Sequence, residues 1–516
     1  MTAAVRIDWR KWRVAELAIL VIAFLIQAPL ILNADLGWLL TVCEKMLAGQ
    51  KLYVDVIELN PPLSVFLYLP AAFLASVLHI PAHLLVIAMI LPLAWGSTLL
   101  TARILGPTMS EAAARRLRLI LLIALAILPG ATFGQREHFA VLGLVPFVAL
   151  AAIVGDDRAG TPSTGLRIFA GLCAGFAMSI KPHFALVAGL PLLWNAARRR
   201  SLKPLFGVEF WCASLVVVAY AVVVFLAFPR FFGVYSRWAA TVYVPIREPL
   251  TSLLDAPLSV IVWVAILLWI VRGTEREGWR GAAPWLLAAL GGFLSYLLQG
   301  KGWAYTRLPA AEFALLSVLL APSVLELRPL RRKMVAVQTA LVGLGVLMVA
   351  AWLVPDNNSF AYLRAPIRAV APPHPKIIAV TSNVGVGEPL THKLGAEWGS
   401  GLGSQLLSGS AIEMLQDRRL DPKGEAMAKQ IIASERARLR HDLIAGRPDV
   451  VLFGDRLRLT RFDWQAWARE DPAVAVELDK NYCFAGRVRA IRIWARRTED
   501  CSITAARLER ATGPKR

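Results

Sequence analysis

Four carboxylates gather in one short stretch near the start of the chain, between two long apolar runs. Asp35, Glu44, Asp55 and Glu58 all fall within NADLGWLLTVCEKMLAGQKLYVDVIELNPPL, residues 33–63. A carboxylate can take a proton from a hydroxyl group as a general base, and its oxygens can bind hydroxyl groups or a divalent cation. This stretch is therefore the first candidate for a polar reaction site.

Cations collect in several other turns that also separate apolar runs. These turns are GQREH (134–138), SIKPH (179–183), QGKGWAYTR (299–307) and the longer loop 229–256. Their charged residues are Arg136, Glu137, His138, Lys181, His183, Arg230, Arg237, Arg247, Glu248, Lys301 and Arg307. Arg, Lys and His bind phosphate oxygens and stabilise negative charge on a leaving phosphate. The alternative is that each charge is a solvated helix flank or a membrane-surface anchor.

The composition indicates a membrane scaffold for these groups. Of the 516 residues, 57% are hydrophobic and only 18% charged, and the mean hydropathy is +0.56. A soluble globular protein of this length is less apolar. The net charge of +20 does not indicate nucleic acid, because Arg and Lys sit in short loops between apolar runs and no basic-aromatic module appears.

The apolar runs predict about eleven transmembrane helices. The expected spans are 14–32, 84–105, 119–133, 139–154, 168–180, 183–197, 207–228, 257–271, 284–299, 308–323 and 335–354. No cleavage site precedes Asp35, so the first span is expected to be retained.

The side of each loop follows from its charge. The N-terminus and the loops 115–118, 198–203, 271–280 and 328–333 are basic, which is typical of the cytoplasmic side. The N-terminus and these four loops can all lie on the cytoplasmic side only if residues 61–79 do not cross the membrane. This segment contains Pro61, Pro62 and Pro70, so we expect a broken helix at the outer membrane surface. Residues 33–83 and 355–516 then lie outside.

The region after 354 is expected to form a separate soluble α/β domain, the transmembrane module being residues 1–354. PKIIAVTS (375–382), PDVVLFGD (448–455) and FAGRVRAIRIWARR (484–497) read as strands of a parallel or mixed sheet. The stretches around 410–420 and 426–445 read as helices. VGVGEP (384–389) lacks the residues of a phosphate loop and is read as a plain turn.

The five cysteines predict no metal site. Cys173 and Cys212 fall in spans and are most simply packing residues, and Cys43 is left unpaired. Cys483 and Cys501 are candidates for a disulfide if the C-terminal domain lies in an oxidising compartment.

Acids and cations on the outer side of a membrane suit one reaction well. A sugar on a polyprenyl phosphate is attacked directly at its anomeric carbon by an acceptor hydroxyl, with inversion of configuration. The carboxylate takes the proton, the cations stabilise the leaving phosphate, and apolar helices hold the lipid tail. No nucleotide site is needed.

The sequence resembles the GT-C superfamily of membrane glycosyltransferases, which includes the protein mannosyltransferases, the lipid A aminoarabinose transferase and the rhizobial lipopolysaccharide transferases. Four places carry the resemblance, which covers roughly residues 14–355: Asp35 after the first span, the following helix with YVD and NPPL, AGFAMSIKPHFALV, and KGWAYTRLPAAEFALL. The sequence departs from many relatives in having Leu36 after Asp35 instead of a second acid. GQREH is not a general superfamily motif.

The resemblance and the residue types together assign expected roles. Asp35 is the catalytic base, with a helix cap as the alternative. Asp55 and Glu58 bind acceptor hydroxyls, help hold a divalent cation, or only shape the loop. The donor phosphate is assigned to Arg136, His138, Lys181 and Lys301. Glu137, His183, Tyr305 and Arg307 are expected to support that pocket, while Trp303 stacks on a sugar or belongs to the interfacial aromatic belt.

The expected function is a hexosyl- or pentosyltransferase that modifies a polysaccharide, lipid or protein of the cell envelope. By the resemblance, it lies in the inner membrane with the N-terminus cytoplasmic and the C-terminal domain periplasmic. The alternatives are a transporter or flippase, a polymerase or ligase that uses a diphosphate-linked donor, and a scaffolding membrane protein. No clear internal repeat favours a transporter.

Overall fold

The computed structural model describes residues 13–29, 33–154, 160–254, 276–320, 360–458 and 460–513. The chain forms two compact units. The first, here called the helical unit, contains residues 1–30, 78–224 and 247–355. The second, here called the sheet unit, contains residues 31–77, 225–246 and 356–516. The domain boundary expected at 354 stays a prediction; these units are defined by contacts within the fold.

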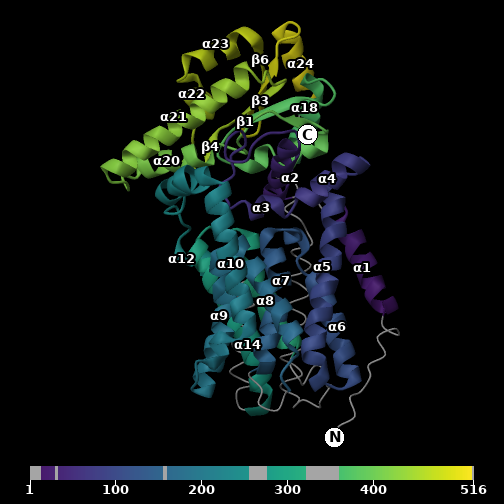
Figure 1. Cartoon of the computed structure of the whole chain (residues 1–516). Helices are drawn as coiled ribbons and strands as arrows, with labels where there is room; N and C mark the ends of the chain where they lie inside the picture. The colour runs from purple at the N-terminus through teal and green to yellow at the C-terminus, as the bar shows by residue number, and fades with distance from the viewer. Residues whose placement is uncertain are drawn as a thin grey trace. The chain divides into compact units, whose positions relative to one another are not determined.

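The helical unit is a bundle built around α7 (Figure 1). Its α-helices are α1 (Arg13–Gln27), α5 (Ala82–Leu105), α6 (Glu111–Ala126), α7 (Arg136–Val154), α8 (Thr164–Ile180), α9 (Ala185–Arg199), α10 (Val208–Ala227, whose last turn belongs to the sheet unit), α12 (Leu250–Leu254), α14 (Arg276–Gln299) and α15 (Leu308–Leu319). Helix α7 is buried along almost its whole length and packs against α5, α8, α9 and α14. Gly143 allows the close approach of α8, since a Cβ there would lie 2.6 Å from the Cys173 carbonyl oxygen.

Several helices of this unit are apolar enough for a membrane protein. Ala82–Thr108, Arg136–Val154 and Val208–Ala227 are long enough to cross a bilayer, and Thr164–Ile180 and Ala283–Gln299 are shorter apolar helices. Exposed Trp211, Leu215 and Phe225 on α10 suit contact with lipid. The number eleven stays a prediction. The expected spans 257–271 and 335–354 lie outside the described residues, as do parts of 14–32 and 308–323.

One span is displaced from its predicted position. Residues 119–133 were expected to form it, but α6 runs from Glu111 to Ala126. The Ser110 hydroxyl caps its start by accepting a hydrogen bond from the Ala113 N–H at 3.2 Å. Pro129 and Gly130 then open a short 3₁₀ turn, which ends the apolar run as a helix.

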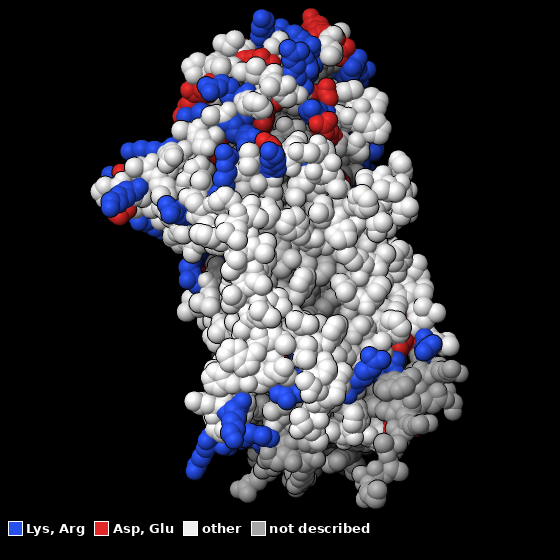
Figure 2. All heavy atoms as spheres, viewed as in Figure 1, with Lys and Arg blue, Asp and Glu red and all other residues white. Residues whose placement is uncertain are grey.

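Charges gather at one end of the described helical surface (Figure 2). Arg198 and Arg199 lie in the last turn of α9, and the basic stretch 115–118 lies in the first turns of α6. The remaining helix surfaces in this view are largely uncharged. This distribution is typical of the cytoplasmic end of a membrane bundle.

The segment 61–79 is a broken helix, as its prolines predict. It forms α3 (Leu63–Phe66) and α4 (Leu69–Leu78). Helix α4 has 10 residues, fewer than a bilayer crossing needs. Its exposed side chains include Phe73, Leu74 and Val77, an apolar face that suits the expected place at a membrane surface.

The sheet unit contains a mixed five-stranded sheet in the order β2-β1-β3-β7-β6. Strands β2 (Glu397–Trp398) and β3 (Val450–Gly454) run parallel to β1 (Lys376–Val380), whereas β7 (Ile491–Arg496) is antiparallel to β3 and to β6 (Tyr482–Val488). A separate two-stranded hairpin pairs β4 (Arg456–Leu457) with β5 (Thr460–Arg461). The helices are α18 (Arg364–Val370), α19 (Leu390–Leu394), α20 (Leu406–Gln416), α21 (Pro422–Ile444), α22 (Trp464–Arg469), α23 (Pro472–Asn481) and α24 (Cys501–Thr512).

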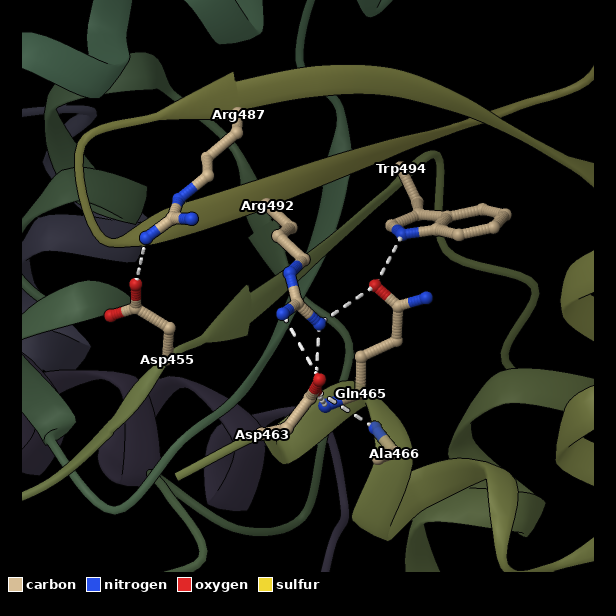
Figure 3. Close-up of polar contacts among 7 residues, drawn as sticks. All are labelled: Asp455, Asp463, Gln465, Ala466, Arg487, Arg492 and Trp494. Atoms are coloured by element: carbon tan, nitrogen blue, oxygen red, sulfur yellow. Dashed lines mark hydrogen bonds and ion pairs between the residues drawn. The ribbon is translucent and has the colours of Figure 1, made fainter. Parts of the chain in front are cut away.

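The prediction of one strand over 484–497 is wrong, because the segment belongs to the β6–β7 hairpin. The chain turns at Arg489, whose φ of 54° is left-handed. Because apolar residues alternate on both sides of this turn, the sequence pattern does not mark where the first strand ends. Side chains fix the hairpin to α22 (Figure 3): Arg492 forms an ion pair of 2.6 Å with Asp463, the residue that caps α22. Arg487 pairs with Asp455 beyond the end of β3.

Two segments from other parts of the sequence complete the sheet unit. Helix α2 (Ala34–Leu47) with α3 and α4 is one. The other is the helical stretch 231–243, formed by the π-helices Phe231–Tyr235 and Ala239–Tyr243 and by α11 (Ser236–Trp238) between them. Val242 from this stretch packs with Leu407, Ala411, Ala428 and Ile431 of α20 and α21. Cys483 and Cys501 form a disulfide between β6 and α24, the pair that the sequence singled out.

Candidate functional site

The three cation-bearing turns of the helical unit lie at one end of its bundle. Helix α7 begins at Arg136, the neighbouring α8 ends at Ile180, and α14 ends at Gln299. Because these helices alternate in direction and pack on one another, GQREH, SIKPH and QGKGWAYTR come together. The convergence follows from packing between helices, although each turn is distant from the others in sequence.

A buried ion pair lies at the centre of this end. Lys181 Nζ is 2.5 Å from Glu137 Oε1 and donates to Gln299 Oε1 at 3.1 Å. The Glu137 side chain is fully buried and that of Lys181 is 11% exposed. An ion pair removed from water to this extent needs further polar contacts to offset its desolvation. Glu137 Oε2, however, has no hydrogen-bond partner among the residues that the structure describes.

Two cations flank one aromatic ring beside this ion pair. The guanidinium carbon of Arg136 lies 5.9 Å from the centre of the Tyr305 ring, and Lys181 Nζ lies 5.6 Å from the same centre. Both distances fall within the range of cation–π attraction. Arg136 and Tyr305 are themselves buried. The ring thus holds two positive charges together that would otherwise repel each other.

Buried polar groups without hydrogen-bond partners among the described residues belong to the same turns as these cations. Within the described ranges of the chain, both side-chain polar atoms of Gln135, which is 0% exposed, and Nε2 of His183 lack a hydrogen-bond partner. Unpaired buried groups are uncommon in folded proteins and are often found where a ligand or water binds. Neither Gln135 nor Gln299 was singled out from the sequence. Their only signal was their position within the cation-bearing turns.

Three other residues predicted for the donor pocket, His138, Arg307 and Lys301, have surroundings that differ from those of Arg136 and Lys181. His138 uses both ring nitrogens on backbone: Nδ1 accepts from the Gly134 N–H at 3.2 Å, and Nε2 donates to the Leu125 carbonyl at 2.8 Å. This geometry gives the imidazole a structural role. Arg307 donates to the Gly302 carbonyl at 2.5 Å and lies over the Tyr296 ring. Lys301 is partly exposed in the turn that follows α14.

Asp35 lies in the first turn of α2, in the sheet unit. The cap of this helix is Asn33, whose side chain accepts from the Leu36 N–H at 3.1 Å. The alternative role predicted for Asp35, capping, therefore belongs to its neighbour. Asp35 is half-buried.

The other acids of the first loop have defined structural contacts. Glu58 is buried and accepts from Trp38 Nε1 at 2.6 Å and from the Asn60 N–H at 2.9 Å, so it ties the loop to α2. Asp55 accepts from the Lys51 N–H at 2.8 Å and closes a turn. Glu44 lies 3.8 Å from His392 Nδ1. Among the described residues, no three His, Cys, Asp or Glu side chains converge as ligands for a metal ion.

The fold has a clear structural counterpart. ArnT from Cupriavidus metallidurans, in a crystal structure with undecaprenyl phosphate bound, aligns with a TM-score of 0.56, covering 98% of this chain and 99% of that chain at 13% sequence identity. The chain has an ArnT-like fold. The apo structure of ArnT aligns equally broadly, with a TM-score of 0.55 and 14% identity.

The ArnT likeness confirms the predicted resemblance at the level of the fold. It extends over the sheet unit as well as the helices, because nearly all of both chains aligns. No protein-family model matches the sequence, and no curated protein matches it significantly. At this identity the likeness establishes the fold, and the roles of individual residues depend on their own geometry.

Proposed function

We propose that this protein is an inverting glycosyltransferase that moves a hexose or pentose from a polyprenyl-phosphate donor to an acceptor of the cell envelope. The observation that carries the proposal is the pair of cations, Arg136 and Lys181, held on the Tyr305 ring in a chain with an ArnT-like fold. The ArnT structure holds undecaprenyl phosphate, whose phosphate group is the kind of ligand that such cations bind.

The donor phosphate is assigned to the end of the helical unit. Arg136 and Lys181 supply positive charge, and Gln135 supplies a buried amide that is free to donate. As the bond from the anomeric carbon to the phosphate oxygen breaks, negative charge develops on that oxygen, and fixed cations stabilise it. Lys301 is retained as a further donor-binding residue, whereas the imidazole of His138 is left to its structural role.

Asp35 is proposed as the base. Its carboxylate takes the proton from the acceptor hydroxyl, whose oxygen attacks the anomeric carbon from the face opposite the phosphate, so the configuration inverts. Asp55 and Glu58 remain proposed contacts of the acceptor, in addition to shaping the loop. Whether these two acids also hold a divalent cation is tested by adding a chelator to the transfer assay.

The proposed location is the inner membrane, with many spans, the N-terminus in the cytoplasm and the C-terminal domain in the periplasm. The disulfide between Cys483 and Cys501 supports an oxidising compartment for that domain. The basic residues at one end of the helical unit support a cytoplasmic side for that end.

The test uses purified wild type and Asp35→Asn in detergent. Each protein receives a panel of polyprenyl-phosphate sugars with an envelope extract as acceptor. The readouts are free polyprenyl phosphate and sugar incorporated into the extract. Asp417→Asn is the matched control, since it neutralises an exposed aspartate that forms an ion pair with the neighbouring Arg419, away from α2.

We expect release and incorporation by wild type and by the Asp417→Asn control, and neither by Asp35→Asn. Wild-type turnover by Asp35→Asn would move the base to another residue. Absence of release from every donor would refute the proposed donor. In that case a diphosphate-linked donor and a lipid-flipping assay in liposomes would test the polymerase or ligase and the transporter alternatives.

A further inference from the structure

Helix α2 carries Asp35, and three of its polar groups lie close to one histidine of the C-terminal region. His392 Nε2 lies 3.1 Å from the Gly37 carbonyl oxygen and 3.2 Å from Thr41 Oγ1. Glu44 Oε1 lies 3.8 Å from Nδ1 of the same ring. Positions 37, 41 and 44 are four and three residues apart, so they share one face of the helix. Since a carbonyl oxygen only accepts, His392 Nε2 carries the hydrogen.

A buried glutamate completes this contact. Glu388 is 0% exposed, and its Oε1 accepts a hydrogen bond from Thr41 Oγ1 at 2.6 Å. Its Oε2 lies 3.6 Å from His392 Nε2. The threonine hydroxyl therefore donates to the carboxylate and accepts from the imidazole, which connects all three side chains. We call Thr41, Glu388 and His392 the α2 clamp.

The backbone of α2 lies directly against the clamp. A Cβ at Gly37 would be 3.2 Å from Glu388 Oε2 and 3.3 Å from Glu388 Cβ, so the absence of a side chain at this position lets the helix lie close to Glu388. Residues Leu36 to Cys43 of α2 are all buried. Burial alone fixes a helix only loosely along its axis, whereas directed hydrogen bonds fix its position and rotation.

The clamp is close enough to Asp35 to control its position. Thr41 follows Asp35 by six residues, or about 9 Å along a helix that rises 1.5 Å per residue. Because a helix moves as a rigid rod over this length, a tilt at Thr41 moves the Asp35 carboxylate. A shift of about 1 Å in a catalytic group can lower the rate roughly 100-fold.

We propose that Glu388 and His392, through Thr41 and Gly37, are positioning residues that hold helix α2 so that Asp35 is placed for proton transfer. This inference rests on the proposed function of Asp35. It gives the C-terminal region a role in the reaction without any contact with the reacting atoms. Glu388 and His392 bind helix α2 of the same chain, so this role requires no further ligand.

Two measurements on the full-length protein in detergent test the proposal. The first is hydrogen–deuterium exchange of peptides that cover residues 34–47, which needs no substrate. The second is kcat and KM with the polyprenyl-phosphate sugar that wild type uses. The variants are Thr41→Val, which keeps the shape of the side chain but loses the hydroxyl, Thr41→Ser, which restores it, and Glu388→Gln.

A matched control is available in α19. Thr391 is also buried, but its hydroxyl donates to the Gly387 carbonyl of its own segment at 2.8 Å. Thr391→Val therefore removes a threonine hydroxyl beside His392 without touching α2. We expect wild-type exchange in α2 and wild-type kcat for this variant.

For Thr41→Val and Glu388→Gln we expect faster exchange in residues 34–47 and a kcat lowered about 10- to 100-fold, with KM within twofold of wild type. Thr41→Ser should restore kcat to within about threefold. A wild-type kcat in Thr41→Val, or an equal loss in Thr391→Val, would overturn the positioning role. If wild type transfers no sugar at all, the proposed function fails separately; unchanged exchange in α2 would then overturn the clamp, and faster exchange would support it.

Discussion

Removing the charge of Lys181 tests the proposed donor site, but the single substitution Lys181→Met changes two things at once. It removes a cation from the proposed site, and it leaves the fully buried Glu137 carboxylate without its ion-pair partner. Breaking a buried ion pair in this way costs about 3–5 kcal/mol of folding free energy. A loss of binding in the single variant would therefore be confused with loss of the fold.

The double variant Glu137→Gln/Lys181→Met separates the two effects. Replacing both members of a buried ion pair by neutral side chains is often neutral for stability or even stabilising. We therefore expect its Tm to return close to that of wild type. Its affinity for undecaprenyl phosphate should stay low, because one charge-assisted hydrogen bond of about 1.5–3 kcal/mol is still missing. At 1.4 kcal/mol per factor of ten, this missing bond raises the Kd about 10- to 150-fold.

A second buried ion pair in the same unit provides the control. Arg167, at the other end of α8, lies 2.8 Å from the buried Glu209 of α10. The variant Arg167→Met/Glu209→Gln changes the same kinds of groups and has no place in the proposed donor site. Both double variants are measured for Tm and for binding of undecaprenyl phosphate in detergent. Undiminished binding by Glu137→Gln/Lys181→Met, or equal losses in the two double variants, would refute the assignment of Lys181.

Two further predictions concern an aromatic ring and a buried acid. Tyr305→Leu should weaken undecaprenyl phosphate binding about 5- to 30-fold, because each of two cations loses roughly 0.5–1 kcal/mol of cation–π attraction. Tyr305→Phe keeps the ring and should bind like wild type. Equal binding losses in the two variants would contradict this role of the ring. Burial raises the pKa of Glu435 from 4.5 to about 7. Because the folded state then holds this proton more tightly than the unfolded state, stability should fall as the pH rises from about 4.5 through 7, by about 3 kcal/mol at 1.36 kcal/mol per pKa unit. Glu435→Gln should therefore raise the Tm at pH 8 much more than at pH 5, and a gain that is the same at both pH values would contradict the prediction.

Local patterns in the sequence predict much of the fold because the hydrophobic effect acts on each segment in a recognisable way. Apolar runs predict the membrane helices, and the β-rich segments that end in turns predict β1 and β3. The boundaries of α6 and the turn inside the β6–β7 hairpin were missed for a common reason. Both depend on one residue, the Ser110 cap and the left-handed Arg489, within a stretch whose apolar pattern continues unchanged.

The candidate site is less visible in the sequence because its contacts join distant segments. The charges of the three turns were recognisable, yet their meeting at Tyr305 depends on how α7, α8 and α14 pack. The clamp is harder still to foresee. VGVGEP was read as a plain turn, and Val384–Val386 of this segment form a short 3₁₀ helix. Its glutamate, Glu388, is buried against Thr41, which lies 347 residues earlier. No local pattern marks such a pair.

The two sets of functional groups are supported by different physics, which predicts how each responds to change. Lys181 and Arg136 lie at the ends of closely packed helices, where Gly143 brings α7 against α8. A substitution in that packing alters folding before it alters chemistry. Asp35 instead depends on a few directed hydrogen bonds between α2 and the segment around Glu388 and His392. Losing one of these bonds leaves the apolar contacts of α2 in place. The helix therefore remains folded, but its position and rotation are less tightly fixed. Variants of the clamp should therefore lower kcat more strongly than they lower Tm, whereas variants of the helix packing should lower Tm and activity together.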